Sequence, residues 1–265
     1  MSQPQHTYST LTLALDGAVA TLTLNRPEKR NAISYELIRE LQHALGEMQK
    51  STSHILILTG SGKAFCSGMD LDDLRRISRQ TEEENLADSG RMADMFRALY
   101  DFPLVTIAAV NGPALAGGCG LATLCDFTLA SSDARFGYTE VRIGFVPAIV
   151  SAFLMRQIGE KHTRDLLLTG RILSAEEGYR LGLVNEVVAP EDLPHRAREL
   201  AKSLAMNSPA SLLATKRLLK TYSHAELDRQ IAAAVEENAR IRATHDFREG
   251  ISSFLEKRAP VWTGS

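Results

Sequence analysis

Two glycine-rich segments of this sequence could supply backbone donors to a negatively charged oxygen. They are residues 64–71 (AFCSGMDL) and residues 111–120 (NGPALAGGCG), and each follows a short apolar run and leads into an expected helix. The first N–H groups of a helix have no acceptor inside it, and small residues let a ligand oxygen approach them closely, as in an oxyanion hole. Alternatively, the glycines only permit tight turns and close packing of helix on strand. Either segment taken alone favours that structural alternative.

Glu140 is the acidic residue whose neighbours best suit proton transfer. It lies among Phe136, Tyr138, Val141 and Ile143. Partial burial in such an apolar turn would raise its pKa toward about 6–7, the range useful to an acid–base catalyst. An isolated glutamate is by default a surface or helix-capping residue, and on these residues alone that alternative stays open.

The elements around these residues alternate between strands and helices and end in helices. Apolar alternation on both sides of Asp16-Gly17 predicts a hairpin over residues 11–24, and Ser34 precedes a helix with an apolar period of three to four. Further expected elements are strands at 55–59, 104–110 and 127–130, and helices starting near residue 70, ending near residue 100, spanning 121–124 and following residue 147. From Ala175 onward almost everything reads as helix, so we expect an α/β core with a helical end.

Composition excludes several classes of protein. The chain has 265 residues, is 44% hydrophobic and carries a formal net charge of −2, which fits one large core and excludes disorder, collagen and disulfide scaffolds. Its 30 Lys and Arg against 32 Asp and Glu argue against a nucleic-acid surface. No apolar stretch is long enough to cross a membrane, and residues 1–9 lack the features of a secretory signal, so we expect a cytoplasmic protein.

Neither a metal nor a nucleotide-phosphate site is expected. Cys66, Cys119 and Cys125 have no metal-ligand spacing and should be buried, inert thiols. The run Gly60-Ser61-Gly62-Lys63 fails the Walker spacing, because Ala64 stands where Ser or Thr would bind magnesium, and it also lacks the third glycine of a dinucleotide fingerprint.

The two glycine-rich segments occur together with residues 24–32 (LNRPEKRNA) and 136–147 (FGYTEVRIGFVP). With these four blocks in this order, and the ending FLEKRAPVW at 254–262, the sequence resembles the crotonase superfamily, the enoyl-CoA hydratase/isomerase family, over nearly its whole length. The resemblance implies an α/β crotonase-like spiral of ββα repeats over residues 1–200. It also implies a C-terminal helical trimerisation region over 201–265, in a homotrimer or a dimer of trimers.

The resemblance further implies an acyl-CoA substrate and no prosthetic group, since coenzyme A is then part of the substrate. The N–H groups of Met69 and Gly117 would hold the thioester oxygen, and Glu140 would move the proton. Coenzyme A would be bound by residues on two parts of the chain, the second of them often reaching across a subunit boundary: Lys29, Arg30, Ala32, Ala64, Asp70 and Leu71, and then Phe254 and Lys257.

The main departure from the family pattern is Gly120. The family's two-glutamate hydratases carry their second acid at that position, three residues after the oxyanion glycine, so here one carboxylate remains. Tyr138 and Cys119 are polar neighbours that could assist Glu140. Smaller departures are Ala116, where the family often has Gly, and Asp72, where several members carry a lysine that contacts coenzyme A.

We therefore expect a lyase of the enoyl-CoA hydratase type that acts on an acyl-CoA thioester through an enolate, with Glu140 as acid and base. The first alternative is an isomerase that shifts a 3-enoyl to a 2-enoyl double bond with the same glutamate. The second is a non-catalytic protein of this fold that binds acyl-CoA or RNA, although the neutral charge balance and the intact Glu140 count against RNA. Arg142 either faces a substrate carboxylate or pairs with a surface acid.

Overall fold

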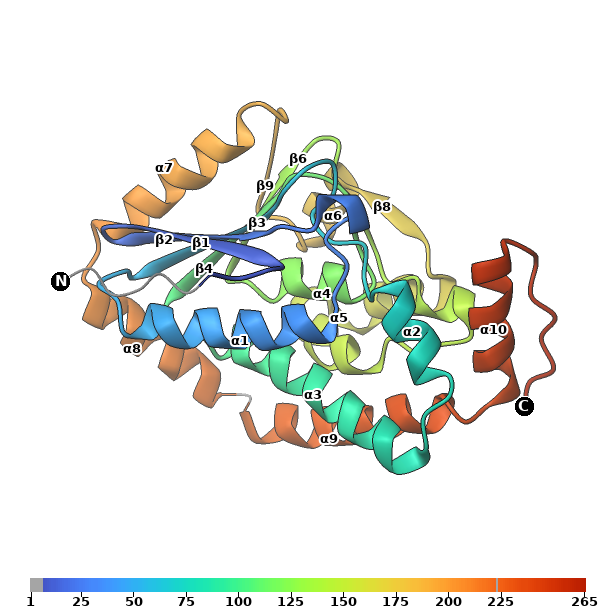
Figure 1. Ribbon diagram of the computed structural model, residues 1–265. Coiled ribbons are helices and arrows are strands. Elements are labelled where there is room, and N and C mark those ends of the chain that lie inside the picture. Colours follow the sequence, from blue (N-terminus) through green and yellow to red (C-terminus); the bar gives the residue numbers. More distant parts are fainter. Residues whose placement is uncertain (1–6, 223) are drawn as a thin grey trace.

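A mixed β-sheet forms the centre of the molecule, and helices cover both of its faces (Figure 1). The computed structural model describes residues 7–222 and 224–265, so most of the stretch searched for a secretory signal lies outside the described residues. The strands are β1 (Leu11–Asp16), β2 (Val19–Leu24), β3 (Ile55–Gly60), β4 (Val105–Val110), β5 (Ala114–Leu115), β6 (Phe127–Ser131), β7 (Arg135–Gly137), β8 (Ile172–Ser174) and β9 (Glu186–Val188).

The helices include two short 3-10 turns, labelled η. They are η1 (Pro27–Lys29), α1 (Tyr35–Gln49), α2 (Leu71–Ile77), α3 (Glu82–Tyr100), α4 (Gly117–Thr123), η2 (Glu140–Ile143), α5 (Ala148–Thr169), α6 (Ala175–Leu181), α7 (Leu193–Ala205), α8 (Pro209–Thr221), α9 (His224–Ile241) and α10 (His245–Glu256). This alternation of strands and helices confirms the predicted α/β class.

The main sheet has the strand order β1-β2-β3-β4-β6-β9, and β5-β7-β8 form a smaller sheet. Only the β1–β2 pair of the main sheet is antiparallel, within the described part of the chain. Because successive side chains of a strand point to opposite faces, Leu56 and Leu58 join the core under α1, α3 and α5, while Ile57 and Ile107 face α7. Because helices cover both faces of the parallel central strands, these strands have continuous apolar runs.

The predicted N-terminal elements are confirmed in detail. Gly17 closes the β1–β2 hairpin with a φ of +57°, a conformation that glycine adopts without strain. Ser34 caps α1, where its side chain accepts a hydrogen bond of 3.2 Å from the Leu37 N–H. The first turn of α3 contains three glutamates, residues 82–84, and Thr81 and Glu84 form a capping box there.

Two expectations about element bounds are wrong. The region after Ala175 contains the strand β9, three residues long and only half-buried, which the surrounding helical pattern hides. Helix α4 begins at Gly117, four residues before the predicted start at residue 121. Glycines have low helix propensity, so the sequence favours a turn there, and packing around the buried Gly118–Gly120 stretch overrides that propensity.

The last helices fold back over the core. Helix α9 packs on α3 and α5, and α10 packs on η2 (Figure 1). Residue 200, the expected boundary of the spiral core, falls within α7, and the division into a core and an assembly region stays a prediction. Within residues 7–222 and 224–265, no helix is both long and apolar enough to cross a bilayer. Cys66, Cys119 and Cys125 are free and buried, as predicted, and burial raises the pKa of each thiol to about 12.

Candidate active site

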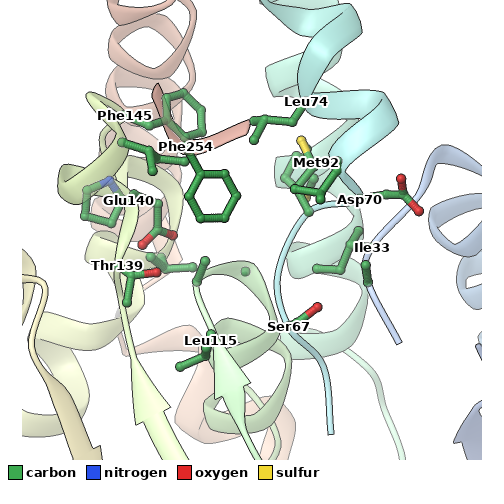
Figure 2. Close-up of a pocket in the computed structure, with 18 of the residues that line it drawn as sticks. Ile33, Ser67, Asp70, Leu74, Met92, Leu115, Thr139, Glu140, Phe145 and Phe254 are labelled. Carbon is green, nitrogen blue, oxygen red and sulfur yellow. The ribbon is translucent and has the colours of Figure 1, made fainter. Parts of the chain in front are cut away.

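A cavity of about 710 Å³ opens between the helices α2, α3 and α10 and the turns that precede α2 and α4 (Figure 2). That volume is in the range of pockets that hold a small organic ligand or cofactor. Its walls are mainly apolar, with side chains such as Ile33, Leu74, Met92, Phe96 and Phe145. The cavity therefore suits an acyl chain, and the polar groups on its wall decide what chemistry it can perform.

The two glycine-rich segments lie side by side at this cavity. The N–H of Leu115 donates a 2.9 Å hydrogen bond to the carbonyl of Cys66, which joins the two turns. A Cβ at Gly118 would lie 2.3 Å from that same carbonyl oxygen, so glycine is required for the two backbones to come this close. The structure thus brings together the two segments that the sequence places about 50 residues apart.

Two backbone N–H groups belong to residues that line the cavity, and neither has an acceptor among the described residues. Ile33 forms an isolated bridge with Met69: its N–H donates to the Gly68 carbonyl, and its carbonyl accepts from the Asp70 N–H. The Met69 N–H between them donates to no other group among the described residues. The Gly117 N–H is likewise unpaired there, because it opens α4.

Ala116, the residue before Gly117, adopts a φ of +49° and a ψ of −128°. Its N–H donates to the Gly137 carbonyl at 2.7 Å. A side chain at positive φ is strained, which accounts for the preference for glycine at this position in the resembled family. In this protein the turn before α4 adopts the positive φ with alanine at position 116.

Glu140 opens η2 and directs its carboxylate toward the cavity (Figure 2). The residue is 8% exposed, and its Oε2 atom has no hydrogen-bond partner among the described residues. Burial raises the pKa of Glu140 to about 7, against an ordinary value of 4.5. The carboxylate can therefore gain or lose a proton near neutral pH.

Helix α10 holds the Glu140 turn in place. A Cβ at Gly250 of α10 would lie 2.2 Å from the carbonyl oxygen of Ile143, so helix and turn meet backbone to backbone. The Phe145 N–H also donates to the Glu140 carbonyl at 3.0 Å. The position of the carboxylate thus depends on the C-terminal part of the chain.

The second acid position is filled by apolar side chains rather than by another polar group. A Cβ at Gly120 would lie 2.8 Å from Val150 Cγ1 and 3.1 Å from Phe96 Cε1. The two polar neighbours that could assist Glu140 do not line the cavity: Tyr138 pairs with the Thr123 hydroxyl at 3.0 Å, and Cys119 is fully buried. Neither residue therefore reaches the cavity to assist Glu140.

Most of the residues predicted to bind coenzyme A lie at the cavity. Those that line it are Lys29, Arg30, Ala32, Asp70, Leu71, Phe254 and Lys257. Ala64 does not; it is buried behind the wall, where its carbonyl accepts from the Asn31 amide at 2.8 Å. Phe254 and Lys257 reach the cavity of their own chain. Arg142 is exposed and does not line the cavity, which disfavours the alternative in which it faces a substrate carboxylate.

Two acidic residues at the start of α2, Asp70 and Asp72, are paired with cations. Asp70 caps α2 and forms an ion pair of 2.9 Å with Arg26. Burial opposes its ionisation, but the hydrogen bond from Asp72 N and the Arg26 guanidinium lower the pKa of Asp70 overall. Asp72, which stands where family members carry a lysine, instead lies 3.4 Å from Lys29 Nζ on the exposed surface.

Several residues that line the cavity belong to no sequence motif. Met92 and Phe96 carry the apolar period of α3 but no motif, and Asn238 and Arg242 lie in the helical end of the chain, where polar residues are common. Only the folding of α9 onto α3 brings these last two to the cavity.

Comparison with known proteins agrees with this geometry. Residues 15–265 match the family model Enoyl-CoA hydratase/isomerase. The chain is 45% identical to a Thermus thermophilus protein named "Putative enoyl-CoA hydratase" (92% of this chain, 97% of the relative). It is 33% identical to the short-chain-enoyl-CoA hydratase of Clostridium acetobutylicum (93% and 94%).

The fold is also matched by solved structures. An enoyl-CoA hydratase/isomerase from Xanthobacter autotrophicus Py2 superposes with a TM-score of 0.87 at 29% identity, covering 95% of this chain and 98% of that one. The expected crotonase-like fold is confirmed. With a matching fold, a family model that spans nearly the whole sequence and close relatives along its length, the chain belongs to the enoyl-CoA hydratase/isomerase family.

Proposed function

We propose that the protein is an enoyl-CoA hydratase that adds water to a 2-enoyl-CoA thioester, with Glu140 as both base and acid. The observation that carries the proposal is the unpaired, buried carboxylate of Glu140, in the same cavity as two unpaired backbone N–H groups. The relatives named as hydratases support the same reaction.

The Met69 and Gly117 N–H groups would bind the thioester oxygen. Attack at the β-carbon turns the thioester carbonyl into an enolate, so negative charge grows on that oxygen during the reaction. Fixed donors stabilise the enolate more than the neutral carbonyl, and each is worth about 2.7–4 kcal/mol in other enzymes. Neither donor has to leave another partner first.

One carboxylate is sufficient for the proton transfers. Ionised Glu140 takes a proton from water while the water oxygen bonds to the β-carbon and the carbon–carbon π electrons shift to form the enolate. Protonated Glu140 then donates that proton to the α-carbon, which regenerates the thioester and the carboxylate. Since the group must ionise and protonate in turn, a pKa of about 7 suits both steps.

The cations at the cavity mouth would meet the phosphates of coenzyme A. Lys29 and Arg30 are adjacent in the sequence and Lys257 is distant from them, and all three line this cavity. Coenzyme A thus belongs to the substrate, and local charge–phosphate contacts explain how a chain of net charge −2 binds a polyanion.

Isomerisation is a second candidate, and the wall around Gly120 favours it. Phe96 and Val150 fill the place where a second carboxylate would hold water. In this reaction Glu140 removes a proton from the α-carbon of a 3-enoyl thioester, and the same proton returns at the γ-carbon as the double bond moves to the 2-position. The two reactions use the same groups and differ in whether water enters.

The substrate that reacts distinguishes the two proposals. Purified protein is mixed with crotonyl-CoA, a 2-enoyl thioester, and separately with the corresponding 3-enoyl thioester, while the absorbance of the conjugated thioester is followed. Loss of this absorbance from crotonyl-CoA supports hydration, whereas a gain from the 3-enoyl thioester supports isomerisation. If no 2-enoyl and no 3-enoyl thioester reacts, with or without a distal carboxylate, both proposals are wrong.

We also propose that the chain assembles as a homotrimer or a dimer of trimers. Helix α8 exposes Leu213, Leu218 and Leu219, followed by Tyr222, on the surface of the single chain. Exposed apolar patches of this kind are typical of interfaces between subunits. Light scattering should give three or six times 29.1 kDa, and a monomer would contradict the proposal.

A further inference from the structure

Asn238 and Arg242 introduce polar groups into an otherwise apolar part of the cavity wall. Asn238 lies in the last turns of α9, and Arg242 follows that helix directly. Both line the cavity and both are buried, the Arg242 side chain to 1% exposure. Neither takes part in the steps proposed for Glu140, Met69 or Gly117.

Contacts along helix α3 indicate that this polar pair lies at the end of the cavity that would hold the acyl chain. Phe96 packs against the oxyanion turn, since a Cβ at Gly117 would lie 3.4 Å from its ring. Met92 lines the cavity one turn earlier, and one turn before that Asp88 forms an ion pair of 2.6 Å with Arg242. Eight residues of helix span roughly 12 Å. Arg242 is thus two helical turns along α3 from the proposed site of the thioester oxygen.

The hydrogen bonds of this pair leave donor groups on both residues without partners in the described part of the chain. Arg242 donates from Nη1 to Asp88 at 2.6 Å and from Nη2 to the Asn238 Oδ1 at 2.7 Å, while its Nε has no partner among the described residues. Because a guanidinium can only donate, Asn238 must turn its oxygen toward it. The Asn238 amide nitrogen then remains a donor, and it makes no hydrogen bond within the described residues.

The charges near these donors favour an anion. Asp88 accepts from Arg242 through one oxygen and from Arg91 through the other, at 3.2 Å, so two cations share one carboxylate. The Arg242 guanidinium also lies 5.4 Å from the centre of the Phe145 ring, which lines the cavity. Figure 2 shows Phe145 and Met92 on opposite sides of the cavity. An alkyl tail here would leave the Asn238 amide nitrogen unpaired, whereas a carboxylate would accept from it and would lie beside the positive charge of Arg242.

We propose that the preferred acyl group carries a carboxylate at the end distant from the thioester, and that Arg242 and Asn238 bind this carboxylate. The inference rests on the proposed function in one respect, namely that the cavity takes an acyl-CoA. It deepens that function by naming the substrate class, the coenzyme A thioesters of dicarboxylic acids.

Binding of saturated thioesters tests this proposal without any turnover. Succinyl-, glutaryl- and adipoyl-CoA are each compared by calorimetry with the alkyl thioester of equal chain length, namely butyryl-, pentanoyl- and hexanoyl-CoA. We expect the dicarboxylic member to bind about tenfold tighter or more in at least one pair, as for a hydrogen bond to a charged group. Equal affinity in every pair, tighter binding of every alkyl member, or no binding at all would overturn the proposal.

Two matched variants test the assigned residues. Asn238→Asp keeps the oxygen that accepts from Arg242 but replaces the free amide donor with a negative charge, so we expect the preference for the carboxylate to disappear. Asn85→Asp adds the same charge beside the same guanidinium, 3.4 Å from Nη1, at a residue that does not line the cavity. We expect this control to keep most of the preference, with folding of both variants checked by their melting temperatures. Equal losses in the two variants would contradict the assignment.

The binding test of the carboxylate site and the turnover test of the proposed function can fail independently of each other. If the dicarboxylic thioesters bind more tightly but no 2-enoyl or 3-enoyl thioester reacts, the proposed reaction is wrong and the carboxylate site stands. If alkyl enoyl thioesters react but no carboxylate preference exists, the proposed function stands and this inference is wrong.

Discussion

Replacement of Glu140 with glutamine should stabilise the ligand-free protein at alkaline pH. Burial raises the pKa of Glu140 from 4.5 to about 7. Below pH 4.5 the carboxyl is neutral in both folded and unfolded states; as the pH rises toward 7, the unfolded state ionises first, so the free energy of unfolding falls. At roughly 1.4 kcal/mol per pH unit, the wild-type chain loses about 3 kcal/mol by pH 8. Glutamine does not ionise and avoids this loss.

Urea unfolding of wild type and Glu140→Gln at pH 5 and pH 8.5 measures this effect. The packing effect of the amide is the same at both pH values and cancels in the comparison. We expect the variant to gain about 2–3 kcal/mol relative to wild type between pH 5 and pH 8.5, at equal protein concentration. An equal difference between the two proteins at both pH values would refute the assignment of a buried, titrating carboxylate.

Glu40 provides a matched control, because its ionisation stabilises the folded protein, whereas the ionisation of Glu140 destabilises it. Its carboxylate accepts hydrogen bonds from the backbone and hydroxyl groups of Ser9 and Thr10, at 2.6–3.0 Å. Burial opposes ionisation, yet these hydrogen bonds lower the pKa of Glu40 overall, so its stabilising contribution is present above its unfolded pKa and is lost as the pH falls through its folded pKa. Glu40→Gln should therefore destabilise the protein at both pH 5 and pH 8.5.

Three further predictions follow from the site. The value of kcat/KM for a reactive enoyl-CoA should rise with pH up to about 7 and then level off as Glu140 ionises, and a profile flat from pH 5 to 8 would contradict this. Lys257→Ala should raise KM for an acyl-CoA but not for the acyl-pantetheine that lacks the nucleotide phosphates; equal effects on both would exclude a phosphate contact. Gly120→Ala should cost about 1–3 kcal/mol of unfolding free energy in urea titrations, and Val150→Ala should restore part of it, because Val150 Cγ1 lies where the new Cβ packs.

Local patterns in the sequence were sufficient for much of the fold. The hairpin, the Ser34 cap and the apolar central strands each depend on residues close together in the chain, and all are confirmed. Strand β9 and the start of α4 were not predictable, because distant packing decides both. The strand pairs with β6, from which α5 and α6 separate it in the sequence. Gly117–Thr123 becomes helical where its glycines meet α3 and α5.

The residues of the candidate site are also of two kinds, those that a local sequence pattern predicts and those that only distant packing brings to the cavity. The blocks around Met69, Gly117 and Glu140 have sequence patterns of their own, so their residues were predictable, and the fold brings them to one cavity. Arg242 has no such pattern: its neighbour Asp88 is 154 residues away, and only the packing of α9 on α3 makes them partners. The apolar wall at Gly120 was equally hidden, because it depends on Phe96 and Val150 from two other helices.

The most direct test of the central claim is the turnover rate of Glu140→Gln against wild type, with the conjugated thioester absorbance as the signal. If Glu140 moves the proton, the variant should still bind acyl-CoA but react at least about 100-fold more slowly with whichever enoyl thioester the wild type converts. An unchanged rate in a folded variant would remove Glu140 from the mechanism and contradict the account.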